Sequence, residues 1–121
     1  MIAVDSSAII AIVRREPEAD RLEDVLIGAD RALMSAATYV ELGAVVDRGG
    51  SSAGSIELDE VLDSLGVSIV DSTPAQARIA RAAYAKFGRG SGHSAALNFG
   101  DCFAYAVARD AGVSLLFKGN D

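Results

Sequence analysis

Short apolar runs alternate along the chain with longer stretches in which apolar residues recur at helical spacing. The short runs end at a polar or charged residue, and we predict strands at about residues 1–4, 32–35, 67–70 and 113–117. The longer stretches carry helix start and stop signals, including Pro74 at a first turn and Gly112 past a last one. The predicted helices cover about residues 6–13, 17–28, 39–48, 56–65, 74–87 and 101–111.

This order of elements predicts a single α/β domain. Strands that alternate with helices require right-handed crossovers and a parallel sheet with helices on its faces. The 121 residues are enough for one core, and half of them are hydrophobic although Trp is absent. The segment 49–55 is rich in Gly and Ser, and we interpret it as a loop within the domain, since neither side is long enough to stand alone.

The charge of the chain is uneven. Eleven basic and 17 acidic residues give a formal net charge of −6, which argues against broad, nonspecific adhesion to nucleic acid. Between Asp71 and Asp101, however, there is no acidic residue. This stretch carries Arg78, Arg81, Lys86, Arg89 and the one histidine, His93. The local cationic strip is either an ordinary solvated helix face or a phosphate-binding track, and both interpretations stay open.

The sequence favours a soluble protein of a reducing compartment. Cys102 is the one cysteine, which excludes an intrachain disulfide and a zinc site built from two or more thiolates of this chain. No basic leader precedes the first apolar run, and the run at 8–13 is far shorter than the roughly 18 residues of a membrane span. We therefore expect a cytoplasmic protein without a membrane segment.

Three acidic residues that are distant in sequence are predicted to meet. Asp5 ends the first strand, whereas Glu41 and Asp101 lie near the starts of helices that can begin at the same sheet edge. Carboxylates placed together repel one another unless a divalent cation joins them, so the pattern predicts a metal site. Each residue also has a simpler explanation, because Asp5 could cap a helix and Asp101 or Glu41 could favour a helix dipole. Asp121, just past the last strand, is a candidate fourth ligand.

Other polar residues allow two interpretations each. Ser7 and Thr38 are candidate donors to the carboxylates or simple helix caps. Asn98 could orient the site or cap the next helix. His93 lies between Gly92 and Ser94 in a loop, where a solvated side chain is the better expectation than a general base, and Cys102 is expected to be buried.

Four segments together resemble one family. They are "VDSSAIIAI", "SAATYVELGAVV", "HSAALNFGDCFAYAVARDAG" and "LLFKGND", in this order along nearly the whole chain. The chain resembles the PIN-domain ribonucleases, in particular the VapC toxins of bacterial toxin–antitoxin pairs, and "LNFGDCFAYA" is the most specific segment. The resemblance implies a three-layer α/β/α fold, a homodimer, and a metal-dependent endoribonuclease that cleaves RNA and is inhibited by a VapB-type antitoxin.

The resemblance also assigns the site. It implies that Asp5 and Asp101 are the main Mg²⁺ or Mn²⁺ ligands, directly or through water, and that Glu41 completes the site. The chain departs from the family pattern after the last strand, where a D-x-D-F-like turn aligns its first acid with Gly119 and its second with Asp121. Relatives usually continue through another strand, so we expect a single PIN-like domain over 1–121 that lacks a C-terminal edge strand.

The chemistry can be argued from the residues alone. Hydrolysis of a phosphodiester needs an activated water, charge neutralisation on phosphate oxygens and help for the leaving oxygen, and hard cations held by carboxylates supply all three. Two alternatives remain: a Mg²⁺-dependent phosphatase or phosphoacceptor that uses Asp5 as nucleophile, and a catalytically degenerate module that only binds an antitoxin. The loop "GRGSGHS" lacks the Lys-Ser/Thr ending of a P-loop, and no G-x-S-x-G elbow is present.

Overall fold

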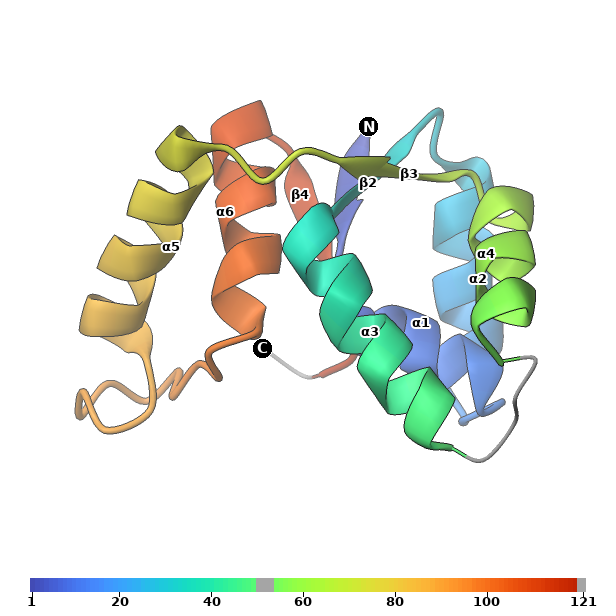
Figure 1. The fold of residues 1–121 in the computed structure, drawn as a ribbon, viewed down its shortest axis with the longest axis horizontal. Helices are drawn as coiled ribbons and strands as arrows, with labels where there is room; N and C mark the ends of the chain where they lie inside the picture. Colours follow the sequence, from blue (N-terminus) through green and yellow to red (C-terminus); the bar gives the residue numbers. More distant parts are fainter. Residues whose placement is uncertain (50–53, 120–121) are drawn as a thin grey trace.

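The computed structural model describes residues 1–49 and 54–119, with the backbone alone for 54–56. Within these ranges strands and helices alternate along the chain (Figure 1). The elements are β1 (Ile2–Val4), α1 (Ser6–Val13), α2 (Ala19–Gly28), β2 (Ala32–Ser35), α3 (Ala36–Arg48), α4 (Gly54–Ser64), β3 (Val67–Val70), α5 (Pro74–Phe87), α6 (Asp101–Ala111) and β4 (Ser114–Leu116).

The described strands form one sheet in the order β3-β2-β1-β4, and their pairings are all parallel. In the register, Ile2 of β1 lies beside Ala32 of β2 on one side and beside Ser114 of β4 on the other. All four strands therefore end at the same edge of the sheet. The central position of β1 places Asp5, the residue after it, in the middle of that edge.

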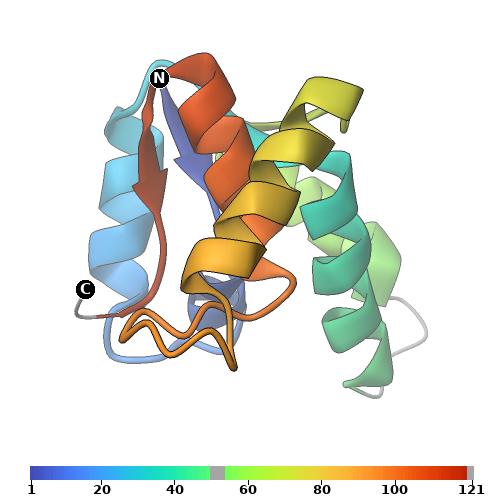
Figure 2. The ribbon, with the colours of Figure 1, turned by 90° about the vertical axis from the view of Figure 1, so that its left-hand side faces the viewer.

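Helices cover both faces of the sheet. Successive strand residues point to opposite faces, so Ala3 and Leu33 pack with α6 while Val4 and Met34 pack with α1, α2 and α3. Figure 1 shows α2 and α4 on one side of the sheet and α5 and α6 on the other. Figure 2 shows α5 in front of α6, on the side away from the sheet, where Ala80 and Ala83 pack against Cys102 and its helix. The expected three-layer α/β/α architecture with a parallel sheet is confirmed.

Three predicted helix starts differ from the structure. Helix α2 begins at Ala19 and not at Pro17, which lies in the turn before it. Helix α3 begins at Ala36 and not after Thr38, because the Ser35 side chain caps it by accepting a hydrogen bond from the Ala37 backbone N–H at 3.2 Å. Helix α4 begins at Gly54, so the predicted loop over 49–55 overlaps its first two residues. The remainder of that loop, 50–53, lies outside the described residues.

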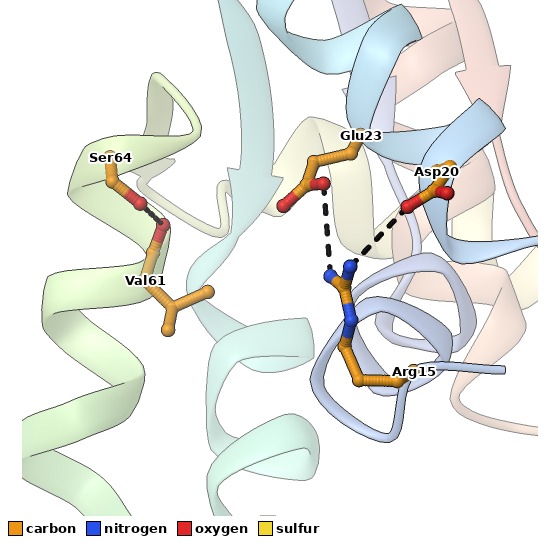
Figure 3. A network of polar contacts seen from close by, with 5 residues as sticks. All are labelled: Arg15, Asp20, Glu23, Val61 and Ser64. Atoms are coloured by element: carbon orange, nitrogen blue, oxygen red, sulfur yellow. Dashed lines mark hydrogen bonds and ion pairs between the residues drawn. The ribbon is translucent and has the colours of Figure 1, made fainter.

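The corner between α1 and α2 is closed by one arginine. Arg15 follows α1 with a positive φ of 53°, which turns the chain sharply. Its guanidinium lies 3.3 Å from the Asp20 carboxylate and 3.7 Å from that of Glu23 on α2 (Figure 3). The same figure shows Ser64, whose hydroxyl donates to the Val61 carbonyl at 2.8 Å near the end of α4. The ion pairs of Arg15 are exposed, so they add little stability.

No helix among the described residues combines the length and the apolar character that a bilayer crossing needs.

Candidate functional site

Asp5 ends β1 and caps α1 at the same time. Its Oδ2 accepts a hydrogen bond from the Ser7 backbone N–H at 3.1 Å, while its other oxygen, Oδ1, is buried and has no hydrogen-bond partner among the described residues. Burial raises the pKa of Asp5, the hydrogen bonds of Ser7 oppose this shift, and the negative charge of Asp101 adds to it. The capping interpretation is therefore correct for one oxygen only, and the second is available to a cation.

Glu41 lies in the second turn of α3, one turn later than expected. Ser6 donates its hydroxyl hydrogen to Glu41 Oε1 at 3.0 Å. Burial raises the pKa of Glu41, the Ser6 hydrogen bond lowers it, and repulsion by Asp5 and Asp101 raises it further. Segments remote in sequence thus position this carboxylate. It extends from α3, accepts a hydrogen bond from Ser6 on α1, and lies against the Cα of Gly100 just before α6.

Asp101 is the first residue of α6. Its Oδ2 accepts a hydrogen bond from the Asn98 backbone N–H at 2.9 Å, which closes the turn before the helix. A carboxylate at a helix N-terminus is also stabilised by the helix dipole. Because Asp101 raises the pKa of both Asp5 and Glu41, the structure brings the three predicted acids into one electrostatic cluster.

A cavity of about 440 Å³ opens beside two of these carboxylates. Lys118 is the one basic residue that lines it among the described residues, and its ammonium group is paired with Glu16. Glu41 does not line this cavity and faces the cluster from the α3 side. The polar and charged side chains of the lining are Asp5, Ser7, Asn98, Asp101, Tyr105 and Lys118.

The donor set suits a hard, hydrated cation. Within residues 1–49 and 54–119 no three carboxylate, imidazole or thiol groups lie close enough together to hold one ion between them. Mg²⁺ keeps several waters and is bound in many sites through only one or two carboxylates, so a pair such as Asp5 and Asp101 is compatible with it. The buried, unpartnered Oδ1 of Asp5 is the observation that fits a cation best.

The polar residues around the three carboxylates make contacts that differ in part from those expected. Ser7 donates to Asp5 through its backbone N–H, and hydrogen bonding by its side chain also lowers the pKa of Asp5, as expected of a donor. Its hydroxyl oxygen accepts from the Lys118 backbone N–H at 3.0 Å. Thr38 is fully buried, and its hydroxyl oxygen has no hydrogen-bond partner among the described residues, so it neither caps α3 nor donates to a carboxylate there. Ser6, which sequence reasoning passed over as a helix start, is the side chain that holds Glu41.

The remaining candidates are placed as follows. Asn98 contributes its backbone N–H to Asp101 and its side chain to the cavity lining. His93 is exposed, as expected, and its Nδ1 accepts from the Ala95 backbone N–H at 3.0 Å. Cys102 is buried, as expected. Asp121, the candidate fourth ligand, lies outside the described residues.

The sequence matches the family model of the PIN domain over residues 2–121. It is 52% identical over 118 residues to Ribonuclease VapC28 of Mycobacterium tuberculosis, an alignment that covers 98% of this chain and 89% of that protein. It is 44% identical over 118 residues to Ribonuclease VapC42 of the same species, with 98% and 90% covered.

Solved structures share the fold at low sequence identity. The crystal structure of M. tuberculosis VapC20, described as a toxin that cleaves the sarcin–ricin loop, matches with a TM-score of 0.74 and 16% identity over 100% of this chain and 92% of that one. A chain of a toxin–antitoxin complex from Klebsiella pneumoniae matches with a TM-score of 0.74 and 13% identity, covering 98% and 87%.

Proposed function

Because this chain belongs to the PIN-domain family, with curated VapC ribonucleases among its relatives, we propose that it is the ribonuclease toxin of a type II toxin–antitoxin pair. In this proposal it hydrolyses RNA phosphodiester bonds with Mg²⁺, for which Mn²⁺ can substitute, and it acts in the cytoplasm. The observation that carries the proposal is the cluster of Asp5, Glu41 and Asp101, in which a buried carboxylate oxygen of Asp5 lacks a partner among the described residues.

Each residue of the cluster has a role in this reaction. Asp5 and Asp101 would hold the cation, which when bound would lower the pKa of a water and neutralise charge on the phosphate. Ser6 orients Glu41, whose carboxylate completes the negative charge of the site. Ser7 fixes the rotamer of Asp5 through its backbone N–H. The hydrogen bond to Asp5 and the one to Asp101 each use only one carboxylate oxygen. These bonds therefore fix both side chains and leave the second oxygen of each outside the cap, which preorganises the site.

The direct test is RNA cleavage by Asp5→Asn and Asp101→Asn variants. Both substitutions remove charge at nearly constant volume, and Asn caps a helix as well as Asp does. We expect both variants to fold and to lose cleavage of total cellular RNA in the presence of Mg²⁺. The matched control is Asp110→Asn, which removes an exposed carboxylate from the same helix as Asp101 and should retain cleavage.

Mapping of the cleavage ends, with and without Mg²⁺, identifies the RNA target in the same experiment. Cleavage by the Asp5→Asn and Asp101→Asn variants at the rate of the parent, after contaminating nucleases are excluded, contradicts the proposal. A stable aspartyl phosphate on Asp5 would instead support a phosphoacceptor.

The second part of the proposal concerns the partner. The cluster carries up to three negative charges, and no arginine or lysine of the described residues forms an ion pair with it. We propose that a VapB-type antitoxin inhibits the protein by placing a cationic segment, with Arg as the bidentate partner of a carboxylate, in this cleft. The fold shared with a chain of a toxin–antitoxin complex supports a protein partner.

Competition tests this mode of inhibition. Raising the Mg²⁺ concentration should weaken inhibition by the antitoxin, and substitution of its arginines by Gln should restore cleavage. Undiminished nuclease activity with saturating antitoxin contradicts the proposal.

We also propose a homodimer, for which the exposed aromatic rings give support. Phe99 is 67% exposed, and it contacts Tyr84 and Phe103 edge to face, with ring centroids 5.9 Å and 5.1 Å away. Exposed apolar clusters of this kind often mark protein interfaces. Phe99→Asp should shift the mass measured by light scattering from dimer to monomer, whereas a monomeric parent chain would contradict the proposal.

A further inference from the structure

We propose that a groove between α5 and α6, adjoining the acidic cavity, binds the single-stranded RNA that flanks the cleaved bond. The groove is defined by Lys86 at the end of α5 and by Tyr105 and Arg109 on α6. The identification of RNA as the ligand depends on the ribonuclease function proposed above. The groove itself follows from the arrangement of these three side chains relative to Asp101.

One face of α6 connects the acids to the groove. Asp101, Tyr105 and Arg109 follow one another at intervals of four residues, so they lie on the same side of the helix. At about 1.5 Å per residue, the eight residues from Asp101 to Arg109 span roughly 12 Å along the axis. A chain leaving the carboxylates in this direction meets first an aromatic ring and then a cation.

Neighbouring hollows on this face share lining residues. Tyr105 lines the acidic cavity and also a neighbouring hollow of about 280 Å³, whose lining includes Lys86, Phe87 and Arg109. Tyr105 and Arg109 also line a third hollow of about 520 Å³ next to β4. Neither of these two hollows has an acidic residue in its lining.

The cations of the groove are available to a ligand. Neither Lys86 nor Arg109 forms an ion pair with a described residue. Lys86 is exposed and its ammonium group lies 5.2 Å from the centroid of the Phe87 ring. Asp110, the nearest acid in sequence to Arg109, lies on α6 with a carboxylate oxygen 3.4 Å from the Gln76 side-chain nitrogen. In a chain of net charge −6, these two cations give the groove a local positive charge.

This combination suits a single strand of nucleic acid. Cations that track the backbone, interleaved with rings on which bases stack, are the usual means of binding single strands without sequence preference. The partly buried Tyr105 offers such a ring between Asp101 and Arg109 on α6, and it shares a hollow with Lys86. The groove therefore accounts for part of the cationic strip that the sequence shows between residues 71 and 101.

The other cations of α5 provide an internal comparison. Arg78 and Arg81 are exposed on the same helix, but neither lines the hollows at Tyr105. Arg81 lines a different hollow, with Tyr84 and Phe99. Replacement of this pair changes the net charge as much as replacement of Lys86 and Arg109, so the two double variants separate a specific groove from general electrostatics.

The test is the salt dependence of RNA binding. A fluorescein-labelled single-stranded RNA of about 16 nucleotides is titrated, by anisotropy and at several salt concentrations, with the full chain carrying Asp5→Asn to prevent cleavage. In that background, Lys86→Ala/Arg109→Ala should weaken binding and reduce the slope of log K against log salt by about 1.4, at about 0.7 for each lost phosphate contact. The control Arg78→Ala/Arg81→Ala should keep the parent slope.

Tyr105 is tested by a conservative pair. Tyr105→Ala should weaken RNA binding by about tenfold without a change in the salt slope, because it removes stacking and no charge. Tyr105→Phe should bind as the parent does. Thermal unfolding by circular dichroism verifies the fold of each variant, and Lys86→Gln/Arg109→Gln replaces the first double variant if that one unfolds.

Two results overturn the inference: an unchanged slope in the Lys86/Arg109 variant, or equal loss in both double variants. The chain without substitutions is assayed in parallel for Mg²⁺-dependent cleavage of the same RNA. Failure of the proposed ribonuclease function is read from that assay, and failure of the groove is read from the salt slopes.

Discussion

The Glu41 carboxylate lies directly against the Cα of Gly100, so that a Cβ on residue 100 would come within 1.7 Å of Glu41 Oε2. Gly100 has an ordinary helical φ of −62°, and a larger residue would therefore meet no backbone strain. The requirement for glycine is steric and comes from one side chain of another helix. Gly100 allows α3 and α6 to place Glu41 next to Asp101.

Gly100→Ala should separate activity from stability. The atoms in the way belong to the flexible end of Glu41, which can swing aside, so the free energy of unfolding should fall by less than about 1.5 kcal/mol. The displaced carboxylate loses Ser6 and leaves the cluster, and RNA cleavage should fall at least as far as in Glu41→Ala. Chemical denaturation and cleavage rates measure the two effects. A variant with parental activity would show that the position of Glu41 is unimportant.

Ser6→Ala should make Glu41 harder to ionise. The Ser6 hydrogen bond lowers the pKa of Glu41, while burial and the neighbouring acids raise it, so removal of the hydroxyl leaves only the upward shifts. Mn²⁺ binding, measured by calorimetry across pH, should then require a higher pH than in the parent chain. Ser64→Ala, which removes an exposed serine hydroxyl at the end of α4, is the matched control and should show the parental pH profile. The same profile in Ser6→Ala and the parent would exclude the proposed role.

Asp5→Asn should stabilise the metal-free protein at neutral pH. Burial raises the pKa of Asp5 in the folded state, so stability falls as pH rises from the unfolded value of about 3.9 through the raised folded value. Below the unfolded value the carboxyl is protonated in both states and the cost vanishes. Asn carries no charge and retains the cap, so its advantage in urea unfolding with EDTA should be largest at neutral pH and disappear below about pH 4.

Bound metal should make the parent chain more stable than the Asp5→Asn variant. Mn²⁺ at 100 times its dissociation constant should stabilise the parent chain by about 2.7 kcal/mol and leave Asp5→Asn nearly unchanged. A metal-free Asp5→Asn variant that is less stable than its parent at neutral pH would contradict the proposed cost of the buried carboxylate.

Leu22→Ala should show the opposite pattern to Gly100→Ala. Leu22 of α2 is fully buried, with 0% of its surface exposed, in the core that α2 shares with α1, and it does not line the acidic cavity. The cavity left by its truncation should cost about 2–5 kcal/mol of unfolding free energy. Under conditions where the variant stays folded, its cleavage rate should equal that of the parent. A selective loss of cleavage in the folded variant would indicate that the α1–α2 packing controls the site.

Several elements could be predicted because their signals are local. Helix α5 starts at Pro74, with Thr73 as its cap, and ends before Gly88 as expected. Helix α6 ends at Gly112, whose φ of 68° is one that glycine adopts without strain. Thr38 misled the prediction of α3, because Ser35 three residues earlier is an equally good cap and the strand pairing of β2 brings it to the helix start.

The site, too, has features that local sequence signals predict and features that only packing sets. Asp5 and Asp101 lie at the end of a strand and at the start of a helix, where a parallel sheet with helical crossovers must place them at one edge. Glu41 also reaches that edge as predicted. Its contacts with Ser6 and Gly100 could not be predicted, because they depend on how α1, α3 and α6 are rotated about their own axes.

The sequence by itself determined the alternating α/β order, the parallel sheet and the approach of three acids to its edge, because hydrophobic periodicity and chain direction are properties of short segments. Only the tertiary structure decided which oxygen of Asp5 stays without a partner among the described residues, which serine holds Glu41, and which cations adjoin Tyr105. Those outcomes depend on packing between segments far apart in the chain, where a rotation of one helix by a fraction of a turn exchanges one neighbour for another.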